Sequence, residues 1–134
     1  MSKEHRSPRP DHLPSAFKSR GGLQRVMKAM GYSLAGLRAA YIHEAAFRQE
    51  LALGIPLLLL APWLAPGRWQ LLAMAGSVLL VWVVELLNAA VEALADAVSI
   101  DHHSLLGRAK DLGSAAVMLC LLNVLLVWAV VLWP

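Results

Sequence analysis

Residues 69–98 read WQLLAMAGSVLLVWVVELLNAAVEALADAV and decide the fold of this 134-residue chain. The first sixteen of these residues, up to Val84, carry no charge, and the helical pattern then continues through Glu85 and Glu92 to Val98. These thirty residues would form a helix about 45 Å long, whereas the hydrocarbon core of a bilayer is about 30 Å thick. We therefore expect a membrane-spanning helix whose last two or three turns project through the inner interface.

Two further apolar stretches complete a pattern of three spans. Residues 51–65 alone would make a helix only about 22 Å long, so the first span must extend back to cover residues 45–65. Residues 112–133 carry no charge and form the third span. We expect a tight turn at residues 66–68 and a polar loop at residues 99–111. Because 58% of the residues are hydrophobic and the mean hydropathy is +0.57, the sequence predicts an all-α membrane protein.

The N-terminal third of the chain is first polar and then amphipathic. Residues 1–22 are basic and rich in Pro and Gly, which predicts a flexible cytoplasmic tail. Residues 23–43, arranged as a helix, gather apolar side chains within about 100° of arc, with Arg25 and Lys28 pointing away. This pattern predicts a helix in the plane of the membrane surface. Residues 23–134 would then form one membrane domain.

Basic residues are concentrated at one end of the chain. Nine of the twelve Lys and Arg residues lie within residues 1–50, one lies in the first turn and two lie in the 99–111 loop. By the positive-inside rule, we expect the N-terminus and this loop on the cytoplasmic side and the C-terminus on the far side. The single cysteine, Cys120, excludes a disulfide-stapled secreted fold. We expect membrane lipids around the protein and no nucleic-acid partner.

Polar residues form a stripe on the long second span. Glu85, Asn88, Glu92 and Asp96 fall within about 80° of arc on a helix. An acidic residue in the middle of a membrane helix costs about 2.5–3.5 kcal/mol on insertion scales. Glu85 lies about 24 Å from the start of the span, still within the hydrocarbon. It therefore needs a partner, a metal or a proton, and it is our candidate for a general base.

Two carboxylates at the inner rim of the membrane are candidates for holding a metal. Glu92 lies about 10 Å nearer the cytoplasm than Glu85, and Glu44 reaches a similar depth on the first span. Carboxylates without Cys or clustered His partners suit a hard cation such as Mg²⁺. A nucleotide would bring that metal, and Lys110 and Arg25 are cations able to hold its phosphate oxygens. Because the chain has no Gly-rich phosphate loop, any nucleotide site is built differently.

Two other groups of polar residues near the interface have simpler explanations. Glu44 and Arg48 stand four residues apart at the start of the first span and can pair. His102 and His103 are adjacent in a loop, where such histidines are usually solvated, and we expect no structural metal there.

Three stretches of the chain resemble the small prokaryotic membrane diacylglycerol kinases. They are GLRAAYIHEAAFRQE at residues 36–50, ELLNAAVEALAD at residues 85–96 and GRAKDLGSAAV at residues 107–117. Together with the three-span layout, the resemblance covers about residues 23–133. It implies a homotrimer in the bacterial inner membrane that transfers the γ-phosphoryl group of MgATP to the hydroxyl of diacylglycerol and forms phosphatidic acid.

The resemblance also assigns roles to individual residues. Glu85 matches the proton acceptor, with Asn88 as its catalytic neighbour. Glu44 and Glu92 match the ligands of the divalent metal. The residues expected to bind ATP are Arg25, Tyr32, Glu44, Glu92, Asp96, Lys110 and Asp111. Those expected to bind the lipid substrate are Arg25, Ala46, Phe47, Arg48, Gln49, Glu50, Glu85 and Ser114. The family's site is shared between neighbouring subunits.

The motifs leave several alternatives open. A related branch phosphorylates undecaprenol with the same catalytic face, although residues 36–50 favour diacylglycerol. A small oligomeric protein that conducts protons or cations through Glu85 and Glu92 is an alternative from another class. A structural oligomerisation module is a third.

The chain also departs from the family in three places. Its tail is longer, His43 replaces a neutral polar residue, and residues 99–106 are divergent. Whether Asp101, His102 and His103 contact nucleotide therefore stays open.

Overall fold

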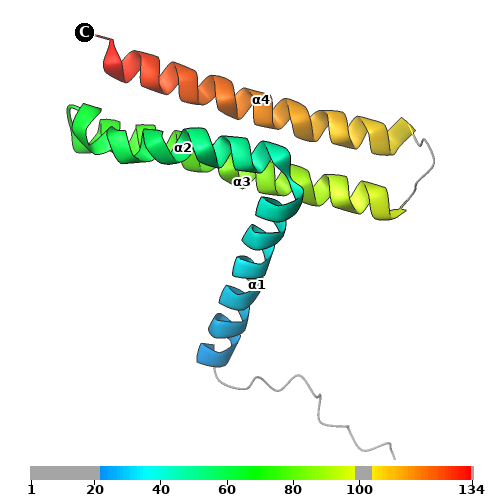
Figure 1. Ribbon diagram of the computed structural model, residues 1–134. Coiled ribbons are helices and arrows are strands. Elements are labelled where there is room, and N and C mark those ends of the chain that lie inside the picture. The colour runs from blue at the N-terminus through cyan, green and yellow to red at the C-terminus, as the bar shows by residue number, and fades with distance from the viewer. Residues whose placement is uncertain (1–21, 99–103, 134) are drawn as a thin grey trace, which may run out of the picture. The chain divides into compact units, whose positions relative to one another are not determined.

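A computed structural model describes residues 22–98 and 104–133 of the chain. Within these residues the structure is helical, with α1 (Gly22–His43), α2 (Ala45–Leu64), α3 (Arg68–Val98) and α4 (Ser104–Leu132) (Figure 1). The last three helices are long and apolar enough to cross a membrane. The predicted fold class, an N-terminal helix followed by three membrane-spanning helices, is confirmed.

The chain divides into two units between Ser33 and Leu34. The described part of the first unit is the beginning of α1, residues 22–33, and every residue in it is exposed. The second unit contains the end of α1 together with α2, α3 and α4. In this second unit α3 is the central helix because it packs against both α2 and α4 (Figure 1).

A small core joins the three long helices near the turn between α2 and α3. Ala61 and Met74 are fully buried there, and Val78 and Trp128 are nearly so. The indole N–H of Trp128 on α4 donates a hydrogen bond to the carbonyl of Met74 on α3, at 3.4 Å. This bond satisfies the polar edge of a buried aromatic ring and ties α4 to α3.

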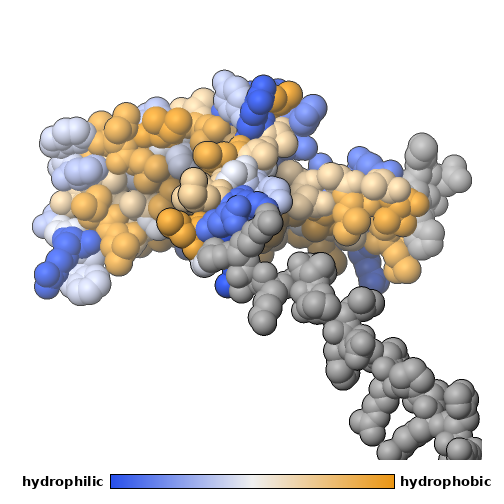
Figure 2. Space-filling view, turned by 90° about the horizontal axis from the view of Figure 1, so that it is seen from below, coloured by the Kyte–Doolittle hydropathy of each residue, from blue (hydrophilic) through white to orange (hydrophobic). Residues whose placement is uncertain are grey.

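Most other large apolar side chains point outward. Leu53, Leu125 and Val130 are 71%, 66% and 75% exposed. Figure 2 shows hydrophobic side chains over much of the coloured surface of one face of the molecule. Exposure of this kind is unfavourable in water but costs little in hydrocarbon, because lipid tails are as apolar as leucine. The three helices therefore suit a bilayer as their surrounding solvent.

The prediction of a polar loop at residues 99–111 is wrong for residues 104–111, because α4 begins at Ser104. Leu105, Ala109 and Lys110 are strong helix formers, and charged side chains do not prevent a helix from extending beyond the membrane into water. Lys110 and Asp111 consequently lie on the second turn of α4 rather than in a loop.

The other boundaries differ little from the expected ones. Residues 65–67 separate α2 from α3, one residue earlier than the predicted turn. The tail predicted for residues 1–22 lies outside the described residues except for Gly22, which begins α1. Asp101, His102 and His103 also lie outside them.

Candidate active site

The C-terminal half of α3 carries the predicted row of polar side chains. Glu85 is buried, with 4% of its surface exposed. Asn88 and Glu92 are half-buried, and Asp96 is exposed. Their spacings of 3, 4 and 4 residues place them on one face of the helix. Exposure therefore increases along this face, from a carboxylate inside the helix bundle to one in solvent.

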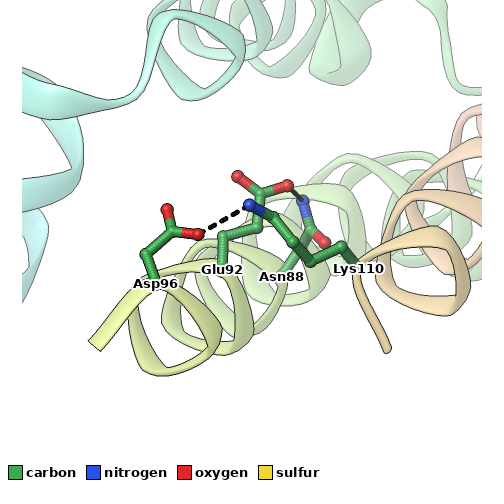
Figure 3. A network of polar contacts seen from close by, with 4 residues as sticks. All are labelled: Asn88, Glu92, Asp96 and Lys110. Carbon is green, nitrogen blue, oxygen red and sulfur yellow. Dashed lines mark hydrogen bonds and ion pairs between the residues drawn. The ribbon is translucent and has the colours of Figure 1, made fainter. Parts of the chain in front are cut away.

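Hydrogen bonds link this row to itself and to α4 (Figure 3). The Nδ2 of Asn88 donates to Oε1 of Glu92 at 3.3 Å. One turn further along, the Nζ of Lys110 on α4 donates to Oδ1 of Asp96 at 2.9 Å. The structure thus brings Lys110 to the polar face of α3, although fourteen residues separate it from Asp96 in the chain.

Asn88 lies directly against the backbone of α4 at Gly113. A Cβ atom added at Gly113 would collide with Oδ1 of Asn88. This Oδ1 atom is buried and has no hydrogen-bond partner among the described residues. Gly113 therefore provides the space that the Asn88 amide occupies.

We expect Gly113→Ala to reduce turnover by up to about a hundredfold. The added methyl group displaces the Asn88 amide and breaks its bond to Glu92, and small displacements of catalytic groups have effects of that size. Turnover of the purified variant in lipid micelles measures the effect. Gly107→Ala is the matched control, since Gly107 is on the same helix and a Cβ there meets nothing within 4 Å. Equal activities of the two variants would contradict this role of Gly113.

Glu44 lies at the junction of α1 and α2 and brings a further carboxylate towards the row on α3. It is the N-cap residue of α2 but makes no side-chain capping hydrogen bond. Glu44 and Glu92 both lie close enough to Glu85 for their charges to repel it. The structure therefore brings Glu44, at the junction of α1 and α2, to the same end of the helices as Glu85 and Glu92 of α3.

The predicted pairing of Glu44 with Arg48 is wrong. The Nη1 of Arg48 instead donates to the carbonyl oxygens of Tyr41 and Ile42, at 3.0 and 3.1 Å. The last carbonyls of a helix have no partner within the helix, and the end of α1 leaves two of them within reach of this guanidinium. As a result, no arginine neutralises the Glu44 carboxylate through a salt bridge within the part of the chain that the structure describes.

The two carboxylates predicted to hold a metal fit a cation that arrives with other ligands. The described residues contain no cluster of three or more His, Cys, Asp or Glu side chains able to hold a metal by themselves. Among residues 22–98 and 104–133, Glu44 uses neither oxygen for capping and Glu92 accepts only the Asn88 bond. Mg²⁺ is commonly bound by one or two carboxylates together with substrate phosphates and waters, so this donor set suits it.

The remaining predicted site residues are placed as follows. Phe47 is buried on α2, and Ala46 and Gln49 are exposed. Glu50 is half-buried, and its Oε2 has no hydrogen-bond partner within the described part of the chain. On α4, Asp111 and Ser114 are exposed. Arg25 and Tyr32 belong to the other unit and are exposed on α1.

We expect Asp96→Asn to leave the midpoint of thermal unfolding nearly unchanged. The Asp96 side chain is 71% exposed and that of Lys110 39%, and ion pairs so open to solvent contribute little stability. Thermal unfolding of the variant in detergent checks this value, with Lys110→Met as the partner control. A large loss of thermal stability in both variants would show that the ion pair between Asp96 and Lys110 stabilises the packing of α3 against α4.

Comparison with known proteins agrees with this geometry. The family model for prokaryotic diacylglycerol kinase matches residues 31–132. The chain belongs to this family. A diacylglycerol kinase of Escherichia coli strain K12 is 45% identical over 112 residues, which cover 84% of this chain and 92% of that protein. One of Pseudomonas aeruginosa is 45% identical over 119 residues, covering 89% and 97%. One of Helicobacter pylori strain 26695 is 38% identical over 109 residues, covering 80% and 84%.

In this diacylglycerol kinase family member, the packing partners of two helix glycines were not predicted from sequence. Gly54 on α2 packs against Trp82 on α3, and Gly113 on α4 packs against Asn88. Glycine inside a helix costs about 1 kcal/mol relative to alanine, so an isolated one often has a packing reason. The sequence therefore indicated that these glycines could pack closely against another helix, but it did not indicate which residue each of them contacts.

Proposed function

We propose that this protein is an ATP-dependent kinase that transfers the γ-phosphoryl group of MgATP to the hydroxyl of diacylglycerol. The observation that carries the proposal is the graded row on α3, from buried Glu85 to the exposed pair of Asp96 and Lys110. A lipid hydroxyl arrives from the membrane and a nucleotide arrives from water. A site that brings them together therefore needs a buried polar group for the hydroxyl and exposed charged groups for the nucleotide. The relatives named diacylglycerol kinase support this substrate.

Glu85 is the proposed general base. The hydroxyl oxygen of the lipid attacks the γ-phosphorus, the bond from that phosphorus to the bridging oxygen of ADP breaks, and the hydroxyl proton passes to Glu85. The products are phosphatidic acid and ADP. Asn88 is the proposed positioning neighbour, because its Nδ2 donates a hydrogen bond to Glu92 and holds that carboxylate in the row on α3.

Charge neutralisation is the proposed task of the neighbouring residues. Glu44 and Glu92 would hold the divalent cation, Mg²⁺ in our proposal, which when bound neutralises charge on phosphate oxygens. Lys110 would exchange the Asp96 carboxylate for a phosphate oxygen. We assign Arg25, Tyr32 and Asp111 to the nucleotide as well. We assign residues 46–50 and Ser114 to the lipid.

We further propose a homotrimer in the bacterial inner membrane with the site shared between subunits. Three spans enclose little space, and the polar face of α3 remains partly open, which supports completion by a neighbouring copy. The nucleotide requires the Lys110 end of α3 and α4 to face the cytoplasm, with the basic N-terminal tail on the same side and the C-terminus on the far side. Residues 23–134 would form the membrane domain and residues 1–22 the tail.

The test is transfer of ³²P from labelled ATP to lipid in mixed micelles, with diacylglycerol and undecaprenol side by side. We expect labelled phosphatidic acid, and we expect no label when Mg²⁺ is chelated. If only undecaprenyl phosphate is labelled, the proposed mechanism stands but the lipid substrate is undecaprenol instead of diacylglycerol. No label in either lipid from a folded oligomer would reject the kinase and favour a proton or cation pathway through Glu85 and Glu92.

A further inference from the structure

An apolar groove of about 220 Å³ lies between α2, α3 and α4. Gly54 and Leu57 of α2, Val78 and Trp82 of α3, and Leu121 and Leu125 of α4 contribute to its lining. Glu50 is its one ionisable lining residue, and it lies at the end nearest to Glu85. The groove therefore begins beside a carboxylate of the proposed lipid site and continues along apolar side chains towards the middle of the three helices.

The Trp82 ring is fixed in this groove by two contacts with α2. Its indole N–H donates to the carbonyl of Glu50 at 3.2 Å. Its Cζ2 atom lies 2.8 Å from the position that a Cβ at Gly54 would take, so the ring occupies the space left by the absent side chain. A ring whose Nε1 and Cζ2 edge is held against α2 has little rotational freedom, and Trp82 is consequently a rigid wall of the groove.

The occupant that this groove fits best is a hydrocarbon chain. Apart from Glu50, the groove is lined by apolar side chains, which suit a hydrocarbon chain better than a polar peptide or a nucleotide. The mouth holds the buried Oε2 of Glu50, which has no partner among the described residues and would accept a bond from a polar headgroup. Val81 and Trp82 of the lining precede Glu85 by four and three residues, so the groove ends about one helical turn from the proposed base.

We propose that Trp82, seated against Gly54, determines which acyl chains of the lipid substrate fit, by setting the width of this groove. The inference rests on the proposed kinase function and names a specificity-determining residue for its substrate. Straight chains pass the ring, whereas a methyl branch at the depth of Trp82 collides with it. An extra methyl group in a rigid apolar pocket changes selectivity by about tenfold or more.

The test compares kcat/KM for a straight-chain diacylglycerol with that for a diacylglycerol branched in mid-chain. We expect the native protein to prefer the straight chain about tenfold, and Trp82→Ala to reduce the ratio to about twofold or less. Both values of kcat/KM in this ratio are measured on the same variant, so a general loss of activity lowers both and leaves the ratio unchanged. Trp69→Ala is the matched control, because Trp69 is an exposed tryptophan on the same helix that does not line the groove. An unchanged ratio in active Trp82→Ala overturns the proposal.

Substitutions at Gly54 and its neighbours test the contact between the two helices. Gly54→Ala pushes a Cβ into the Trp82 ring and against Cγ1 of Val78, and it should reduce kcat/KM for long chains more than for short ones. Trp82→Phe with Val78→Ala removes both colliding groups, so we expect the triple variant to recover most of the long-chain activity. Failure of these two changes to rescue Gly54→Ala would contradict the interlocked arrangement.

A measurement without turnover separates this inference from the proposed function. A diacylglycerol carrying a mid-chain diazirine, photolysed on the full-length protein, should label Leu121 or Leu125 of α4, as mapped by mass spectrometry. Labelling there without phosphorylation of any lipid would support the groove and reject the kinase. Phosphorylation with no label on the groove lining would support the kinase and reject the groove, as expected if a second copy of the chain fills it.

Discussion

Glu85→Gln should lower kcat by about 10²–10⁴-fold and leave the affinity for MgATP nearly unchanged. The glutamine amide has the same shape as the carboxylate but does not accept the proton of the lipid hydroxyl, and general-base catalysis contributes a factor of that size. Glu85 is 4% exposed and lies deeper than the residues assigned to the nucleotide, so its replacement should not disturb nucleotide binding. Steady-state rates with varied ATP and lipid measure both quantities.

The stability of the Glu85→Gln oligomer provides the control. Removing a charge from a buried position near Glu44 and Glu92 relieves repulsion, so we expect thermal stability in detergent equal to or above that of the native protein. A stable oligomer without turnover would exclude a purely structural role for Glu85. Full turnover in the variant would show that the proton goes elsewhere and would remove Glu85 from the mechanism.

Glu92→Gln should raise the Mg²⁺ concentration needed for half-maximal activity by roughly 10–100-fold. Loss of an anionic oxygen weakens a site that has only one other proposed carboxylate, Glu44, and changes around metal sites commonly have effects of this size. The amide can still pair with Asn88, so the geometry of the row on α3 should persist. A Mg²⁺ titration of the initial rate at saturating ATP measures the shift.

Asp96→Asn is the matched control for Glu92→Gln. It removes the same charge from the same face of α3, four residues away, but from a carboxylate paired with Lys110. We expect it to change the KM for ATP more than the Mg²⁺ dependence. If both variants shift the Mg²⁺ titration equally, the effect of Glu92→Gln is a general loss of negative charge and the proposed ligand assignment fails.

The helices and the polar face of α3 could be predicted from sequence because both depend on local spacing. Residues 69–98 contain the length that exceeds a bilayer and the 3, 4, 4 spacing that aligns Glu85 with Asp96. The start of α4 could not be placed, because the charges of residues 104–111 suit both a loop and a helix in water. The partner of Arg48 depended on where α1 ends, since the carbonyls of Tyr41 and Ile42 there accept its hydrogen bonds.

The sequence by itself therefore determined which residues share one helix face, and only the tertiary structure decided which faces meet. Helical periodicity repeats every 3.6 residues and contains no information about the sliding of one helix along another. That sliding places Gly113 under Asn88, Lys110 beside Asp96 and Trp82 against Gly54. Close packing of α3 against α2 and α4 sets each of these pairs, because a shift of one turn would put a different side chain in each position.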